Sequence, residues 1–167
     1  ARAARAAGVA IGAHPGLPDL QGFGRRELRV TPDEAHALVL YQIGALQAMA
    51  HAAGTRVVHV KPHGALYTMA ARDAALSDAI AHAVHDADPS LVLVGLADSE
   101  TTRAGARRGL RVAHEGFADR RYRGDGTLVA RGTAGALIDD VDEAVAQAVA
   151  LARGSAITTH DGTTRTI

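Results

Sequence analysis

The chain has 167 residues, a length typical of one domain, and 47% of them are hydrophobic although only 3% are aromatic. Its formal net charge is zero, which excludes the general attraction to nucleic acids and anionic membranes that a strongly basic protein shows. The chain has no cysteine, so disulfides, thiolate metal sites and a cysteine nucleophile are excluded.

The first thirty residues predict a helix, a strand and a long loop. Residues 2–7 are rich in Ala and Arg, which is typical of a helix, and Gly8 would end it. Residues 9–13 predict a short buried strand. Residues 14–30 are rich in Gly and Pro, and a loop of this length inside a compact domain is usually functional or disordered.

A long helix is expected next. Thr31 is a good N-cap residue, Pro32 suits the first helical position, and Glu34 completes a capping box. The helix should run to Ala53, and Gly54 should end it.

The middle of the chain predicts two further strands with helices between them. Residues 56–60 predict one strand, and the fully apolar residues 91–96 predict another that is covered on both faces. Between these strands we expect a short helix over 65–71 and a longer one that Asp73 caps and that ends before Pro89.

The next segment predicts one more helix and strand. Asp98 or Ser99 would cap the helix, and residues 110–114 would form the strand. A second long loop follows, in which Asp125 and Gly126 give a turn signal.

The last segment predicts a helix and a hairpin. Asp140 would cap the helix and Gly154 would end it. Its apolar spacing predicts that three valines face inward: Val141, Val145 and Val149. The remaining residues resemble a hairpin that turns at Asp161–Gly162.

A strand followed by a helix occurs four times along the chain. This alternation predicts right-handed βαβ units and therefore a parallel sheet, either open or closed into a barrel. No internal repeat or linker divides the chain, so we expect a single α/β domain over residues 1–167.

Polar residues follow the ends of the predicted strands, and a parallel sheet brings such positions to one edge. His14 follows the first strand, and Asp19 lies in the loop beyond it. Lys61, the only lysine, and His63 follow the second strand, and Glu115 follows the fourth. We predict that these five residues are catalytic.

Three of these residues have both a functional and a structural interpretation. His14 would be a general base or a metal ligand, or would only bond to the backbone at the strand end. Lys61 would hold a carboxylate or phosphate as a point charge, or would be a solvated loop residue. His63 would donate a proton or stabilise the turn.

The charged residues of the two long loops are also ambiguous. Glu115 and Asp119 would serve as acid and base or help to bind a cation, or would pair with neighbouring arginines. Arginines at three positions are candidates for binding an anion such as phosphate, although charged loop residues are usually just solvated: Arg25, Arg120 and Arg121. There is no P-loop motif anywhere in the chain.

Several long and unusual segments resemble the LamB/YcsF family, in order along essentially the whole chain. They are GVAIGAHPGLPDLQGFGRR, LVLYQIGALQA, HVKPHGALYTMAARD and EGFADRRYRGDGTLVARGTAGA. The family motif HPG-x-PD falls on residues 14–19, the motif KPHGALY on residues 61–67, and the motif FADR-x-Y on residues 117–122.

The resemblance implies a distorted (β/α) TIM-like barrel of the glycoside hydrolase and deacetylase type. Family members also have an acidic N-terminal segment, a CGFHAGD segment and a CVHGD strand, which this sequence lacks. We therefore expect the barrel to be incomplete at both ends, with this chain as the central part of a longer family domain.

The resemblance also implies an activity. The family is identified with one component of 5-oxoprolinase, which uses ATP to open the lactam of 5-oxo-L-proline to L-glutamate and works with two partner subunits, B and C. On this basis Arg25, Arg120 and Arg121 are predicted to bind the nucleotide. We expect a cytoplasmic protein that binds neither nucleic acid nor membrane, because no apolar run could span a bilayer and no signal peptide is recognisable.

Two other functions stay open at this point. The first is a metal-dependent amide or acetyl hydrolase, in which His14 would be one ligand of a divalent metal. The second is a non-catalytic subunit that binds a small acid or a sugar at the same edge of the sheet. Self-association into a homo-oligomer is also left open.

Overall fold

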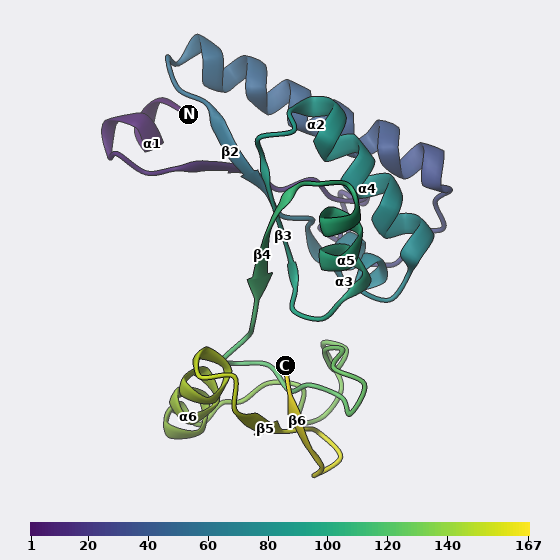
Figure 1. Ribbon diagram of the computed structural model, residues 1–167, viewed down its shortest axis with the longest axis vertical. Helices are drawn as coiled ribbons and strands as arrows, with labels where there is room; N and C mark the ends of the chain where they lie inside the picture. The colour runs from purple at the N-terminus through teal and green to yellow at the C-terminus, as the bar shows by residue number, and fades with distance from the viewer. The chain divides into compact units, whose positions relative to one another are not determined.

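The computed structural model describes residues 1–167, which divide into two compact units (Figure 1). Unit 1 consists of residues 1–95 and 100–113, and unit 2 of residues 96–99 and 114–167. The single continuous domain stays a prediction. No helix in either unit combines the length and the apolar character that crossing a bilayer requires.

A four-stranded sheet organises unit 1, and two of its strands end in residues that belong to unit 2. Its strands are β1 (Ile11–Ala13), β2 (Val57–Val60), β3 (Val92–Leu96) and β4 (Arg111–Glu115), in the order β1-β2-β3-β4. β2 pairs in parallel with both β1 and β3. The predicted α/β class with a parallel sheet is therefore confirmed. The strand order leaves β1 and β4 at the two edges, and no closure of the sheet into a barrel is found.

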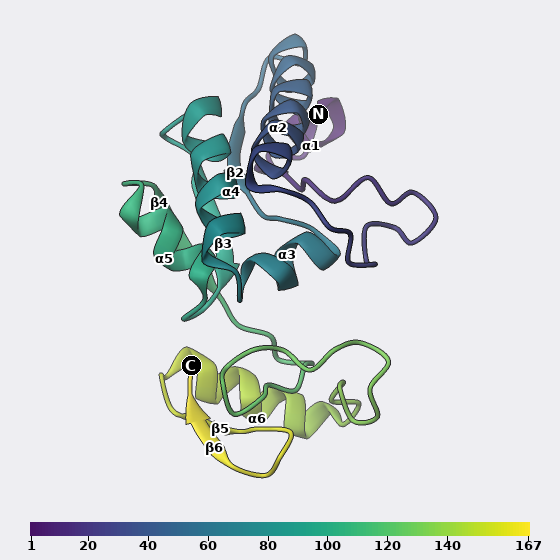
Figure 2. The same cartoon turned by 90° about the vertical axis from the view of Figure 1, so that its right-hand side faces the viewer.

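Helices alternate with these strands as the sequence predicts. They are α1 (Arg2–Ala6), α2 (Pro32–Ala52), α3 (Gly64–Ala70), α4 (Ala74–Ala87) and α5 (Glu100–Arg107). Figures 1 and 2 show α2 and α4 side by side, with α5 next to α4. The predicted helix and strand boundaries agree with these elements to within about two residues.

Local hydrogen bonds explain where the helices begin. The Thr31 hydroxyl accepts a hydrogen bond from the Glu34 backbone N–H at 3.2 Å, and the Glu34 carboxylate accepts one from the Thr31 N–H at 2.8 Å. This is the predicted capping box. Asp73 caps α4 in the same way by accepting from the Leu76 N–H at 3.0 Å.

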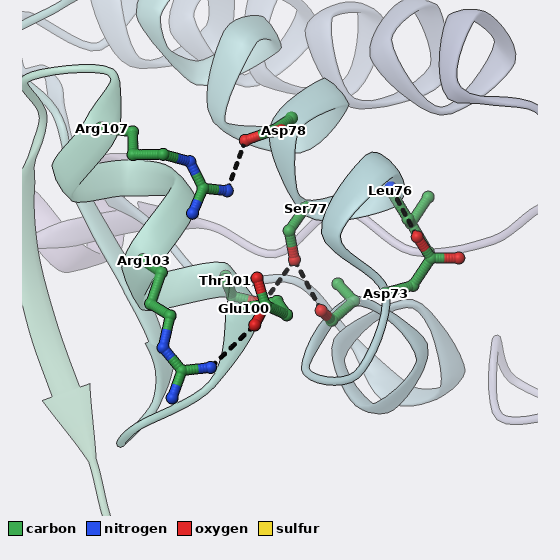
Figure 3. A network of polar contacts seen from close by, with 9 residues as sticks. Asp73, Leu76, Ser77, Asp78, Glu100, Thr101, Arg103 and Arg107 are labelled. Carbon is green, nitrogen blue, oxygen red and sulfur yellow. Dashed lines mark hydrogen bonds and ion pairs between the residues drawn. The ribbon is translucent and has the colours of Figure 1, made fainter.

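A polar network joins α3, α4 and α5 within unit 1 (Figure 3). The buried Ser77 hydroxyl donates to the Ala70 carbonyl at 2.5 Å and lies 3.3 Å from the Thr101 hydroxyl. On the surface, the Arg107 guanidinium donates to the Asp78 carboxylate at 2.8 Å. These contacts fix α5 and the end of α3 against α4.

The core of unit 1 is aliphatic and lies where the helices pack on one another and on the sheet. Its fully buried side chains come from α2, β2, α3, α4 and β3 and include Val39, Ile43, Val60, Leu66, Ile80, Val84 and Leu93. Burial of such side chains contributes about 1.5–3 kcal/mol each before entropic costs. This core holds the ends of β1 and β2 next to each other.

Unit 2 contains α6 (Val141–Ala152), β5 (Ala156–Thr158) and β6 (Thr164–Thr166). β5 and β6 pair antiparallel, which confirms the predicted hairpin around Asp161–Gly162. The turn signal at Gly126 is also confirmed, because its N–H donates to the Arg123 carbonyl at 2.9 Å and its φ is +87°.

The predicted inward face of α6 is wrong. Val141, Val145 and Val149 are 74%, 56% and 41% exposed, whereas Gln147 is buried at 7% exposure. The Gln147 side-chain amide donates to the carbonyls of Phe117 at 2.7 Å and Arg120 at 2.8 Å. The inward face of α6 consists of Ala144, Gln147, Ala148 and Leu151. Gln147 is buried there because the loop before the helix presents backbone carbonyls that need donors.

Candidate active site

The pairing of β1 with β2 continues beyond both strands and brings their polar residues together. The Lys61 N–H donates to the Ala13 carbonyl at 2.9 Å, and the His63 N–H donates to the Pro15 carbonyl at 2.8 Å. These bonds place His14 between the two paired positions. The expectation that His14, Lys61 and His63 lie at one edge of the sheet therefore holds within unit 1.

The two histidines form a chain of hydrogen bonds. His14 Nδ1 lies 2.6 Å from the Lys61 carbonyl oxygen, and His14 Nε2 lies 3.0 Å from His63 Nδ1. His63 Nε2 lies 2.7 Å from the Phe23 carbonyl oxygen. The rings meet edge to face, with their centroids 4.8 Å apart.

The partners of these rings fix where two of their protons lie. Carbonyl oxygens only accept, so His14 Nδ1 and His63 Nε2 each donate to a backbone carbonyl. The two remaining nitrogens face each other at hydrogen-bond distance. A further proton taken up by either ring would lie between them, beside the solvent-exposed His14.

Close backbone packing encloses His63. Gly64 has φ +56°, and a Cβ there would lie 2.4 Å from the Gly24 carbonyl oxygen. That oxygen accepts a hydrogen bond from the Ala65 N–H at 2.9 Å, so the loop before α2 docks directly on the start of α3. A Cβ at Gly24 would lie 3.0 Å from the His63 ring. These two glycines allow the loop to approach closely enough for the Phe23 carbonyl to bond His63.

Gln42 is a supporting residue that was not predicted from the sequence. Its side chain projects from α2 and bonds both backbone groups of Gly16: Oε1 accepts from the Gly16 N–H at 3.0 Å and Nε2 donates to the Gly16 carbonyl at 2.9 Å. It thereby fixes the backbone two residues after His14. The available signal was a glutamine in the middle of an otherwise apolar helix face.

Asp19 anchors the same loop. Its side chain is only 1% exposed and forms an ion pair with Arg26, and it also accepts from the Gly22 N–H at 3.0 Å. Hydrogen bonding from Arg26, reinforced by the backbone donors, lowers the pKa of Asp19 to about 2 despite the opposing effect of burial. A carboxylate this acidic and this fully bonded is a weak general base. Its catalytic role stays a prediction, and its surroundings favour positioning the loop.

The low pKa of Asp19 predicts acid sensitivity. Between about pH 4 and pH 2 the unfolded chain binds a proton that folded Asp19 does not, so stability falls as the pH falls through this range. Asp161 in unit 2 acts in the same direction, because the Thr159 and Thr163 hydroxyls lower its pKa to about 2. The urea concentration at the midpoint of unfolding should therefore depend less steeply on pH, between pH 2 and pH 5, in Asp19→Asn than in the parent protein. An unchanged slope would contradict the role of Asp19.

Two cationic side chains border the histidine pair. Lys61 is half-buried, and its Nζ lies 5.8 Å from the centroid of the Tyr67 ring. Arg25 is exposed, with its guanidinium carbon 5.4 Å from the Phe23 ring centroid. Phe23 itself is 69% exposed and has φ +55°. Unit 1 thus presents two contacting imidazoles together with the side chains of Lys61 and Arg25, which suits an anionic substrate.

The remaining predicted site residues belong to unit 2, and their meeting with the histidine pair stays a prediction. Glu115 ends β4, and its carbonyl accepts from the Ala97 N–H at 3.0 Å. Asp119 is exposed. Arg120 is 4% exposed and donates to the Val129 carbonyl at 2.5 Å, while Arg121 pairs with Glu143 at 2.5 Å. These contacts favour structural roles for the two arginines, and their nucleotide-binding role stays a prediction.

A metal ion at His14 fits poorly with the described contacts of unit 1. The two imidazole nitrogens that converge are already at hydrogen-bond distance. No third His, Asp or Glu of unit 1 joins them in a group able to hold an ion. A tight site needs three or four protein ligands, so we derive no chemistry through a metal here.

Known proteins resemble this chain over nearly all of its length. It is 59% identical to the A subunit of 5-oxoprolinase from Methylococcus capsulatus, over 97% of this chain and 62% of that protein. It is 55% identical to the A subunit of 5-oxoprolinase from Bacillus subtilis, over 93% of this chain and 60% of that protein. The chain thus spans about 60% of the length of these curated relatives.

A solved structure supports the same relationship. The crystal structure of the lactam utilization protein from Thermus thermophilus matches with a TM-score of 0.88 and 46% identity, over 99% of this chain and 67% of that one. This match confirms the predicted fold class. The model of the LamB/YcsF family matches residues 1–167. With its whole length matched in sequence and its fold matched in space, this chain belongs to the LamB/YcsF family.

Proposed function

We propose that this chain acts as part of the A subunit of a 5-oxoprolinase, which opens the lactam ring of 5-oxo-L-proline to L-glutamate with cleavage of ATP. The observation that carries the proposal is the 59% identity to a protein named as that subunit, over 97% of this chain. The similar Thermus thermophilus structure is that of a lactam utilization protein, which agrees with a lactam substrate. Subunits B and C are the proposed partners.

Lactam opening requires activation because resonance makes the amide carbonyl a poor electrophile. Transfer of the γ-phosphoryl group of ATP to the carbonyl oxygen would give a phosphorylated lactim and ADP. Water would then give up a proton as its oxygen adds to the carbon, which becomes tetrahedral. Cleavage of the C–N bond with protonation of the nitrogen would leave an acyl phosphate, and a second water would hydrolyse this to glutamate and inorganic phosphate. The step most dependent on a protein acid is protonation of the leaving nitrogen.

The histidine pair suits that step. A proton held between His14 Nε2 and His63 Nδ1 would be the one transferred, and both outer nitrogens are held by carbonyl oxygens. The pair would therefore give up this proton, keep its orientation and take up a proton again from water. Lys61 would bind the substrate carboxylate or a phosphate oxygen, and Arg25 a phosphate of ATP. Glu115 is proposed as a second proton carrier for the leaving nitrogen.

The test is ATP-dependent release of glutamate by the complete polypeptide reconstituted with its partner subunits. We expect turnover only when 5-oxoproline and ATP are both present. We expect Lys61→Ala to raise the KM for 5-oxoproline or ATP and to lower kcat/KM by about 10-fold or more, because it removes the ammonium group that would bind the substrate carboxylate or a phosphate. A wild-type kcat/KM in Lys61→Ala would contradict its assigned role.

The same assay discriminates the two other functions. Turnover that needs no ATP and is abolished by a chelator would support a metal-dependent amide or acetyl hydrolase instead. Stabilisation by a sugar or small acid in thermal unfolding, without turnover in the reconstituted complex, would support a non-catalytic binding role.

A further inference from the structure

A second cluster of potential ligands lies on the outer helices of unit 1, apart from the histidine pair described above. His36 comes from α2, and His82 and Asp86 come from α4. His36 Nε2 lies 2.9 Å from Asp86 Oδ2, and His82 Nε2 lies 3.4 Å from the same oxygen. The ligand atoms of all three residues lie within 4.8 Å of one another.

Helix geometry explains why these side chains converge. His82 and Asp86 are four residues apart, which places them on the same face of α4 one turn apart. Helix α2 packs closely on α4 (Figure 2). This packing brings His36 opposite that face, with the His36 and His82 ring centroids 4.8 Å apart. The cluster therefore depends on the helix pair rather than on a flexible loop.

The donor set and its spacing suit a metal ion. Two imidazole nitrogens and a carboxylate oxygen are the usual ligands of Zn²⁺ and neighbouring divalent transition metals. In a tetrahedral site with bonds of about 2.0–2.1 Å, ligand atoms lie roughly 3.3 Å apart. The two distances to Asp86 Oδ2 are 2.9 and 3.4 Å, close to this value. The third pair of ligand atoms lies within 4.8 Å, so a rotation of the two rings toward each other by up to about 1.5 Å would complete the geometry. Both histidines would bind the ion through Nε2, with their ring protons on Nδ1.

An open cavity adjoins the cluster. It has a volume of about 300 Å³ and is lined by both histidines together with Asp33, Asp78 and Arg108. The cavity leaves space for water or a small ligand at the coordination positions that the protein does not fill. Three protein ligands with an open fourth position are typical of exchangeable metal sites, whereas closed structural sites use four.

We propose that His36, His82 and Asp86 form a binding site for a divalent transition metal such as Zn²⁺, with its open coordination position toward the cavity. The ion would link α2 to α4 across the surface of unit 1. The three side chains are 26%, 48% and 38% exposed, so the site is solvent-accessible and its metal exchangeable. This site is independent of the proposed 5-oxoprolinase activity.

Titration calorimetry of the chelator-treated full-length protein with Zn²⁺ tests the proposal. We expect wild-type protein to bind a Zn²⁺ ion at this site with a dissociation constant of about 1 micromolar, and His82→Ala and Asp86→Asn each to weaken this constant about 10-fold or more. His51→Ala is the matched control, because His51 is an exposed histidine on α2 outside the cluster. It should bind as wild type does.

Co²⁺ and thermal unfolding give a second readout. Co²⁺ should give the intense visible absorption of a site of low coordination number in wild type and His51→Ala, and much less in His82→Ala. Zn²⁺ should raise the Tm of wild type but not of His82→Ala, and unfolding without metal shows whether each variant is folded. Equal Zn²⁺ binding by wild type and Asp86→Asn, or no binding by wild type at 100 micromolar Zn²⁺ (about 100 times the expected constant), would overturn the proposal.

Discussion

Replacing His63 by alanine is expected to lower ATP-dependent glutamate release by the reconstituted enzyme by about 100-fold or more, the usual effect of losing a positioned general acid. The substitution removes both the proton partner of His14 and the bond to the Phe23 carbonyl. His14→Ala should cause a similar loss. Because the transferred proton would lie between the two rings, the double variant should be little worse than either single variant.

Suitable controls separate this effect from a change in folding. His63→Gln keeps a donor for the Phe23 carbonyl but cannot carry the exchangeable proton, so it should fold normally and remain slow. His51→Ala removes an exposed histidine of the same unit and should leave the rate unchanged. Losses that multiply in the double variant, or a His63→Gln enzyme with the wild-type rate, would show that the pair does not act as one proton donor.

Replacing Gly64 by alanine is expected to be the most damaging small substitution in unit 1. The residue has φ +56°, which costs an L-residue about 1–2 kcal/mol. The added Cβ would also lie 2.4 Å from the Gly24 carbonyl oxygen, so the backbone of the loop must move away. Overpacking of this kind adds about 1–3 kcal/mol. We therefore expect the free energy of unfolding in urea to fall by about 2–5 kcal/mol, together with loss of activity.

Gly109→Ala is the matched control for this prediction. Gly109 also lies in unit 1 and has φ +76°, but nothing lies within 4 Å of a Cβ built there. Its substitution should therefore show the conformational cost alone, about 1–2 kcal/mol. Equal losses of stability at the two glycines would mean that the loop does not dock as described on the start of α3.

The elements that were predictable from sequence are those set by neighbouring residues. The start of α2 depends on Thr31, Pro32 and Glu34, which lie within four positions of one another. The start of α4 depends on Asp73 and the Leu76 N–H. A cap, a turn or an apolar period is complete within a few residues, so its physical cause is visible in the sequence itself.

Part of the candidate site was predictable for a related reason. His14, Lys61 and His63 follow strand ends, and parallel pairing brings such positions to one edge. The direct contact between His14 and His63 was not predictable, because it depends on ring orientations that the docked loop and Gln42 impose. Asp19 was predicted as catalytic from its position alone, and its ion pair with Arg26 became evident only in the structure.

The prediction for α6 failed because periodicity identifies an apolar face but not what covers it. The three valines have helical spacing, yet Gln147 occupies the buried face because the carbonyls of residues 117–120 require donors. The His36, His82 and Asp86 cluster was missed for a similar reason. Each residue looks like an ordinary surface side chain of its own helix, and their meeting depends on how α2 packs against α4.

The amino-acid sequence alone determined the family, the α/β class and the order of helices and strands, because these depend on local caps, apolar periods and unusual motifs. Only the tertiary structure decided which ionisable groups touch: His14 with His63, Asp19 with Arg26, and His36 with Asp86. The contacts of His14 with His63 and of His36 with Asp86 join residues about fifty positions apart in the chain. Such contacts, and the protonation states that follow from them, are set by packing between elements, and no local pattern in the chain encodes that packing.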